Sequence, residues 1–228
     1  MQKIGVWADL TTYTARTFES FTNRNFRLLW LGMFCVSAGF SMQMIAGGIL
    51  VYDITDNAVL TSVALMGWAP GLLIVSLYGG VLGDRVERRF LIQCAQSLMA
   101  IAAGSIAILI FLDLVDWTHL FAASMVQGAA FALQVPARQA VVPGLVGKER
   151  LSNAVALNAM AFSITSVASP GIGGLIYAVA GPGVAYLTVT ALTVCGVLVT
   201  SKLPKMHPTG NSSAVSVWRN ITGGLSYF

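Results

Sequence analysis

Charged side chains are scarce in this sequence. Asp, Glu, Lys and Arg make up 10% of its 228 residues, whereas hydrophobic residues make up 56% and the mean hydropathy is +0.76. A soluble domain carries roughly 25% charged residues, because its surface faces water. This chain has too little charge to cover such a surface, so much of it must face lipid. The composition excludes a soluble globular protein and predicts an all-α, polytopic membrane protein.

Residues that bind metals or perform catalysis are also few. The three cysteines are dispersed in apolar stretches without a CxxC pair, which argues against a disulfide framework and a zinc site. The two histidines fall at the edge of an apolar stretch and in the C-terminal tail. No GxxxxGK[ST] loop, HExxH helix or GxSxG elbow is present. We therefore expect no metal, no cofactor and no enzymatic activity.

Long apolar stretches are the main feature of the chain. A helix needs about 20 apolar residues to cross a bilayer. Six stretches meet this length approximately and predict six transmembrane helices, at residues 28–51, 59–82, 90–112, 120–135, 154–178 and 183–200. Residues 1–27 lack the apolar run and cleavage site of a signal peptide, so they are expected to remain as an N-terminal segment.

The positions of the basic residues assign the two sides. Every Lys and Arg lies before the first span, in the second or fourth loop, or after the last span. The first and third loops carry aspartates instead. Basic loops mark the cytoplasmic side, so 1–27 and the linker 201–228 are predicted to be cytoplasmic, flanking a six-helix domain at 28–200 in the cytoplasmic (inner) membrane. The net charge of +4 then reflects topology, and no nucleic-acid partner is expected.

The loop between the second and third spans carries a motif, GVLGDRVERR, at residues 80–89. It resembles the G-x-L-A-D-R-x-G-R-K signature of the major facilitator superfamily, although Glu87 stands where glycine is usual. The resemblance implies one half of a transporter fold, built from two inverted three-helix repeats, with the substrate site between two such halves. It also implies that the loop latches the halves in the outward-facing state. The matching residues are Gly80, Asp84, Arg85, Arg88 and Arg89.

Arg138, at the cytoplasmic end of the fourth span, is the candidate partner of Asp84; extension of its side chain to lipid headgroups is the alternative. The fourth span also resembles the family's R-x-x-Q-G-x-x-x-A motif, but Ser124 replaces the arginine that is usually linked to proton transfer. No charged residue falls inside a predicted span. A coupling proton is therefore expected to use a carboxylate outside this sequence.

The fifth span contains TSVASPGIGG at residues 165–174, which resembles the exporter signature G-x-x-x-G-P-x-x-G-G. The candidate residues are Ser169, Pro170, Gly173 and Gly174. Pro170 is expected to bend the helix, and the motif favours export over import. A general packing seam of small residues is the alternative. The segments at 25–28 and 136–156 further resemble the branch that includes the enterobactin exporter and macrolide-efflux-like proteins.

In the family that the chain resembles, the first and fourth helices line the central cavity. Gln43, Gln127 and Gln134 are therefore candidate substrate contacts, with interhelical hydrogen bonds as the alternative. The predicted function is proton-coupled efflux of a small molecule, such as a drug or a siderophore, by alternating access. The alternatives are an importer, a lipid flippase, or a non-transporting scaffold or regulatory partner. A second six-helix half is expected, in the same longer chain or in a second subunit.

Overall fold

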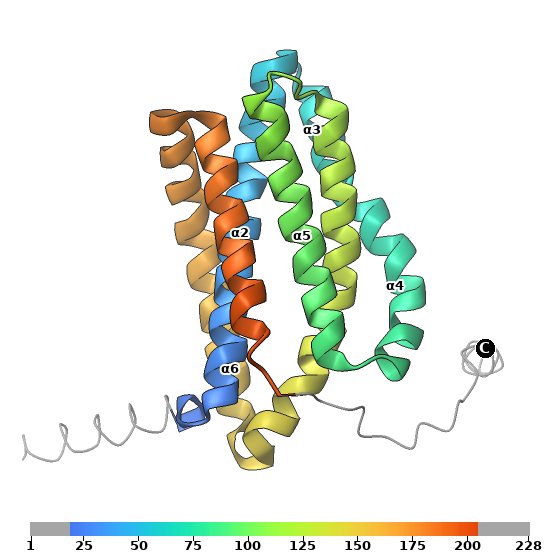
Figure 1. Ribbon diagram of the computed structural model, residues 1–228, viewed down its shortest axis with the longest axis vertical. Coiled ribbons are helices and arrows are strands. Elements are labelled where there is room, and N and C mark those ends of the chain that lie inside the picture. Colours follow the sequence, from blue (N-terminus) through green and yellow to red (C-terminus); the bar gives the residue numbers. More distant parts are fainter. Residues whose placement is uncertain (1–18, 205–228) are drawn as a thin grey trace, which may run out of the picture.

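The computed structural model describes residues 19–204, and for residues 19, 77–85 and 148 it describes the backbone alone. The predicted N-terminal segment 1–27 and linker 201–228 thus lie mostly outside the described residues. Within them the chain is helical apart from short connections (Figure 1). The elements are η1 (Glu19–Thr22), α2 (Arg24–Thr55), α3 (Ala58–Met66), α4 (Trp68–Arg85), α5 (Arg88–Phe111) and α6 (Trp117–Thr200).

Five helical segments of the described chain are long and apolar enough to cross a membrane: Arg24–Thr55, Ala58–Ser76, Arg88–Phe111, Trp117–Gly147 and Glu149–Thr200. The all-helical membrane class predicted from composition is confirmed. Five segments stand where six spans were predicted, because the fifth and sixth predicted spans belong to one segment, Glu149–Thr200. That segment leaves helical geometry at Gly181, with φ 84° and ψ 171°. Figure 1 shows the ribbon of α6 reversing direction there.

The connection predicted between the spans 120–135 and 154–178 contains a break at Gly147, but this stretch is helical on both sides of the break. Gly147 has φ 75° and ψ 169°, a conformation that glycine adopts without a steric penalty. The helix continues past Pro136 because its next turns are anchored in the core: Ala137, Val141 and Val142 pack in one cluster with Phe26. At Pro170, by contrast, the backbone keeps helical dihedral angles, so the predicted bend does not break the helix.

The second predicted span is divided at Gly67 into α3 and α4. A Cβ atom at Gly67 would lie 2.7 Å from the carbonyl oxygen of Phe121. A Cβ at Gly71 would lie 2.0 Å from the carbonyl oxygen of Met125, and one at Gly128 would lie 2.0 Å from that of Trp68. The backbones of α4 and α6 therefore touch where a glycine of one helix lies against the backbone of the other, as is common between membrane helices.

Side-chain caps fix where three helices begin. Asn23 accepts hydrogen bonds from the amides of Asn25 and Phe26 at the start of α2, and Asn57 caps α3 in the same way. Asp116 caps α6 in a reciprocal capping box, in which Nδ1 of His119 accepts from the Asp116 amide. The hydrogen bonds from Thr118 lower the pKa of Asp116. His119 thus has a local structural role.

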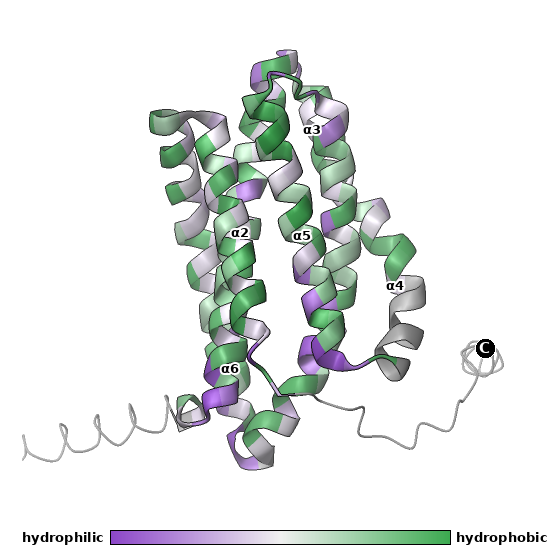
Figure 2. Cartoon of the chain, viewed as in Figure 1, coloured by the Kyte–Doolittle hydropathy of each residue, from purple (hydrophilic) through white to green (hydrophobic). Residues whose placement is uncertain are grey.

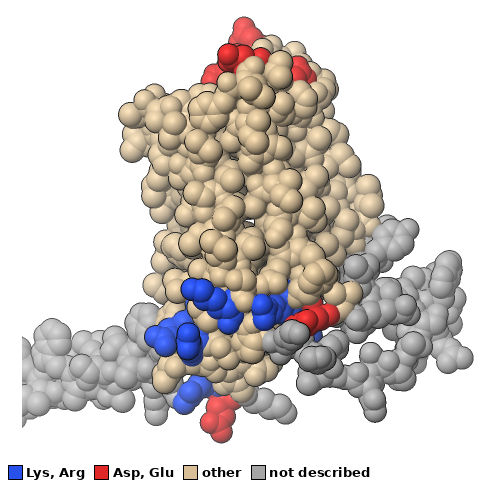
Figure 3. Space-filling view, viewed as in Figure 1, with Lys and Arg blue, Asp and Glu red and all other residues tan. Residues whose placement is uncertain are grey.

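The two ends of the bundle differ in charge. Figure 3 shows the acidic side chains gathered mainly at one end and the basic ones at the other, with an uncharged belt between them. Figure 2 shows that this belt is mostly hydrophobic. The acidic end holds Asp53, Asp56, Asp113 and Asp116, and the basic end holds Arg24, Arg27, Arg88, Arg89, Arg138, Arg150 and Lys202 together with Glu87 and Glu149.

Candidate functional site

The three glutamines singled out from the sequence are all buried. Gln43 on α2 and Gln127 on α6 are each 6% exposed, and Gln134 on α6 is 5% exposed. Gln43 and Gln127 line one cavity of 40 Å³, together with Trp68 and Ser124. Gln134 lines a second cavity, of 50 Å³. The structure therefore brings two of the amides to one cavity and places the third in another.

Aromatic side chains lie between these two cavities. Phe40 lines both of them, Trp68 lines the first and Phe131 lines the second. The rings of Phe40 and Phe131 are stacked with centroids 5.9 Å apart, and those of Trp68 and Phe131 are 5.7 Å apart. Such contacts stabilise offset aromatic pairs. An aromatic partition thus separates the first cavity, toward the acidic end, from the second, toward the basic end.

Helical spacing explains why α6 supplies so much of this lining. Gln127, Phe131, Gln134 and Arg138 follow one another at intervals of four, three and four residues, so they share one face of the helix. Arg138 lines the second cavity together with Ser37 of α2. It also lines a larger cavity of 520 Å³ on its other side. The polar face of α6 therefore runs from the paired amides to a cation at the basic end.

The motif between α4 and α5 attaches the start of α5 to both arms of α6. Nη1 of Arg88 donates a hydrogen bond to the carbonyl oxygen of Ala140 at 2.8 Å. Nη2 of Arg89 donates to the carbonyl oxygen of Ser201, just after the end of α6. A cation is favourable at such a helix C-terminus. Gly80, Asp84 and Arg85 lie at the end of α4, and because their side chains are not described, the pairing of Asp84 with Arg138 stays a prediction.

The fifth-span motif packs against α2. The hydroxyl groups of Ser37 and Thr165 are 2.8 Å apart and share a hydrogen bond. A Cβ atom at Gly173 would lie 3.1 Å from Cβ of Met42, and one at Gly174 would lie 3.8 Å from a methyl group of Ile45. Ser169 is buried, whereas the position of Gly171 is open. The motif residues thus provide a close helix contact, and their role in the direction of transport stays a prediction.

We expect Thr165→Val to destabilise the protein by about 1 kcal/mol, because it leaves the Ser37 hydroxyl without its interhelical partner. Thr188→Val is the matched control: Thr188 also donates to the carbonyl oxygen four residues earlier, Val184, but it makes no hydrogen bond to another helix among the described residues. Thermal unfolding of the two variants in detergent measures the difference. Equal losses would contradict the importance of the Ser37 contact.

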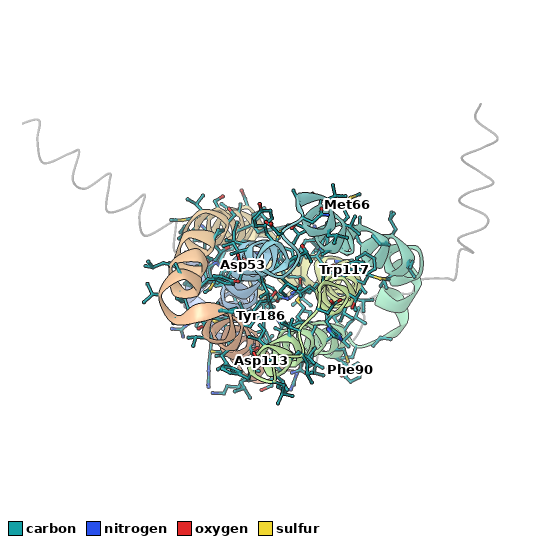
Figure 4. All side chains as sticks on the ribbon, turned by 90° about the horizontal axis from the view of Figure 1, so that it is seen from above. Asp53, Met66, Phe90, Asp113, Trp117 and Tyr186 are labelled. Carbon is teal, nitrogen blue, oxygen red and sulfur yellow. The ribbon has the colours of Figure 1, made fainter. Side chains whose placement is uncertain are left out.

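Two tyrosines in the bundle carried no signal in the sequence. Tyr186 is 1% exposed, lines the first cavity and approaches Gly47. Figure 4 shows Tyr186 among the helices, whereas Met66 and Phe90 lie at the periphery. The Tyr177 hydroxyl donates to Oδ2 of Asp53 at 2.6 Å. The two spans that hold them have uniformly apolar sequences, so periodicity did not indicate which of their faces are buried.

Comparison with known proteins agrees with this architecture. The family described as Transmembrane secretion effector matches residues 15–228. The chain is 27% identical over 187 residues to "Enterobactin exporter EntS" of Shigella boydii serotype 4 and 30% identical over 189 residues to that of Shigella boydii serotype 18. It is 29% identical over 189 residues to that of Escherichia coli O1:K1 / APEC.

Each of these matches covers 82% of this chain and 45% of the relative. The chain thus spans less than half the length of the curated relatives that it matches. Together with the apolar helices and the opposed charges of the two ends, the family match decides the classification. The chain belongs to the transmembrane secretion effectors of the major facilitator superfamily, a family of transporters and not of enzymes.

Proposed function

We propose that the protein exports a small molecule from the cytoplasm by alternating access. The observation that carries this proposal is the pair of buried amides, Gln43 and Gln127, at a cavity between α2 and α6. Polar groups in the apolar part of a membrane protein usually mark a substrate or ion pathway. The names of the matched relatives support export, and they make a siderophore such as enterobactin the first candidate substrate.

The orientation follows from the charges. We propose that the basic end of the bundle faces the cytoplasm and the acidic end faces outward, with both termini cytoplasmic. Six crossings fit this arrangement, with Glu149–Thr200 crossing twice around Gly181. The break at Gly181 has a positive φ, as a tight reversal requires. The boundary between transmembrane domain and linker near residue 200 is part of the same proposal.

A second six-helix half completes the proposed transporter. The arm of α6 after Gly147 exposes large apolar side chains, among them Val155, Phe162, Val167 and Leu175. Part of this surface contacts lipid, and part is available to a second half across the substrate site. Proton coupling would use a carboxylate of that half, because no Asp or Glu with a described side chain lines the cavities at the amides.

A neutral substitution in the cavity tests the proposal. We expect Gln127→Leu to reduce transport of enterobactin into inside-out vesicles by about fivefold, because one hydrogen bond to the substrate is worth about 1 kcal/mol. Gln93→Leu is the control, since Gln93 lies on α5 and lines neither of the two amide cavities. Both variants are compared with the wild-type full chain at equal membrane levels.

The same assay separates the alternatives. Accumulation in right-side-out but not inside-out vesicles would indicate an importer, and movement of labelled phospholipid alone would indicate a flippase. A protein that moves none of these compounds in either orientation would contradict transport and favour a scaffold or regulatory partner.

A further inference from the structure

A cavity of 520 Å³ lies between the two arms of α6, on either side of Gly147. Its volume is within the range of about 300–1,000 Å³ that is typical of small-molecule sites. Val142, Leu151 and Phe162 belong to its apolar wall, while Arg138 and Asn158 supply charged and polar groups. The cavity lies at the basic end of the bundle, apart from the two amides Gln43 and Gln127.

Arg138 differs from the two arginines at the start of α5. Arg88 and Arg89 each donate to a backbone carbonyl. Arg138 is only half-exposed, and it makes no hydrogen bond or ion pair with any side chain that the structure describes. A cation withdrawn from water without a partner is costly. Its planar guanidinium presents paired donors that match carboxylate or phosphate oxygens. An anion in the cavity would satisfy it.

Asn158 supplies a second unsatisfied group. Its Oδ1 atom is buried and has no hydrogen-bond partner among the described residues. A buried acceptor without a donor also costs free energy, and a ligand hydroxyl or amide N–H would supply that donor. The cavity thus combines a cation and a buried acceptor, neither with a partner among the described side chains, and an apolar wall that includes the aromatic ring of Phe162.

The charge of the basic end favours the approach of anions to this cavity. Figure 3 shows the basic side chains gathered at this end of the bundle. Clustered charge of one sign raises the local concentration of opposite charges. Under the proposed orientation, an anion would reach Arg138 from the cytoplasm.

We infer that Arg138 and Asn158 form the recognition site for an amphipathic anion. Its acidic oxygens contact Arg138, and a hydrogen-bond donor next to them contacts Asn158. Its aromatic body lies against Phe162. This inference rests on the proposed function where it names the anion as a substrate. The shared chemistry also fits an anionic lipid headgroup. An Asp84–Arg138 pair would use the same guanidinium, so pairing and anion binding would exclude each other.

The test uses two aromatic probes of nearly equal shape, 3-hydroxy-2-naphthoate and the neutral 3-hydroxy-2-naphthamide. Binding to the full chain is measured by equilibrium dialysis in phosphatidylcholine nanodiscs. We expect the wild type to prefer the anion by about tenfold, because a hydrogen bond to a charged group is worth about 1.5 kcal/mol or more. Arg138→Gln should abolish this preference, and Arg138→Lys should keep part of it.

Two further variants make the assignment specific. Asn158→Asp places a carboxylate in the same cavity and should also abolish the preference for the anion. Arg27→Gln removes an exposed basic residue that lines none of the cavities described here, and it should leave the preference unchanged. A wild type without preference, an Arg138→Gln variant that keeps it, or an Arg27→Gln variant that loses it would each overturn the inference.

Nanodiscs with 30% phosphatidylglycerol distinguish the two sources of the anion. If naphthoate binding persists there, the site takes a soluble anion; if phosphatidylglycerol abolishes it, a lipid headgroup occupies the site and the substrate assignment is overturned. Transport of both probes is measured in parallel in inside-out vesicles. Absence of transport for either probe would count against the proposed function, while the binding comparison would still decide the role of Arg138.

Discussion

Gly128→Ala is expected to destabilise the bundle by about 3 kcal/mol, at the upper end of the cost of over-packing. The added methyl group would lie 2.0 Å from the carbonyl oxygen of Trp68 and 2.9 Å from the backbone nitrogen of Leu72. Both atoms belong to the α4 backbone, which has no rotamer through which to yield. The helices must separate, and the contacts along their seam are weakened. Thermal unfolding of the full chain in detergent should show a midpoint lowered by about 10 °C.

Gly171→Ala is the matched control, because Gly171 also lies inside α6 and a Cβ atom there meets nothing within 4 Å. Alanine is a better helix former than glycine, so this change should be neutral or stabilising by up to about 1 kcal/mol. The first cavity is also lined by Trp68 of the same seam, so Gly128→Ala should reduce transport as well. An unchanged unfolding midpoint for Gly128→Ala would show that α4 and α6 are not in backbone contact.

Asp84→Asn is expected to reduce transport by about tenfold or more. The side chains of aspartate and asparagine have nearly the same shape, so the change removes charge and little else. Charge-assisted hydrogen bonds are about twice as strong as neutral ones, and a coupling free energy of about 1–3 kcal/mol corresponds to a 5–150-fold effect. The loop that follows Asp84 is tied to α6 through Arg88 and Arg89, so a change in its electrostatics reaches both arms of that helix.

Asp113→Asn is the control for this change. Asp113 is exposed at the opposite end of the bundle and has φ 56°, a left-handed conformation that asparagine also adopts readily. Vesicle transport and surface expression are measured for both variants. Full transport by Asp84→Asn would contradict the latch, and an equal loss in Asp113→Asn would indicate a general effect of removing charge.

Much of the fold follows from local chemistry. The scarcity of charge and the apolar stretches predicted a helical membrane protein, and the structure confirms that class. The basic and aspartate-bearing loops predicted two ends of opposite charge, which Figure 3 shows. The starts of three helices could also be predicted from the sequence, since the capping residues Asn23, Asn57 and Asp116 each precede an apolar run. These features depend on residues close together in the chain or on composition alone.

The ends of the helices were harder to predict from the sequence. The fourth span was predicted to end at residue 135, but the tertiary contacts of Ala137, Val141 and Val142 keep the following turns helical. Both breaks in α6, at Gly147 and Gly181, fall between predicted spans, but the exact residue is marked by the backbone conformation, which distinguishes these glycines from others such as Gly171. A sequence of uniformly apolar residues gives little periodicity, so it does not show where a helix packs or turns.

The site shows the same division. The sequence by itself singled out Gln43, Gln127, Gln134 and Arg138 as candidates, because amides and cations are rare in an apolar chain and the resemblance placed the first and fourth helices at the cavity. Only the tertiary structure decided that Gln43 and Gln127 share a cavity, that Phe40 and Phe131 separate Gln134 from it, and that Arg138 meets Asn158 across the break at Gly147. The physical reason is that a cavity forms where side chains from distant segments fail to fill the space between helices. The position of such a space depends on how each helix packs against all of its neighbours.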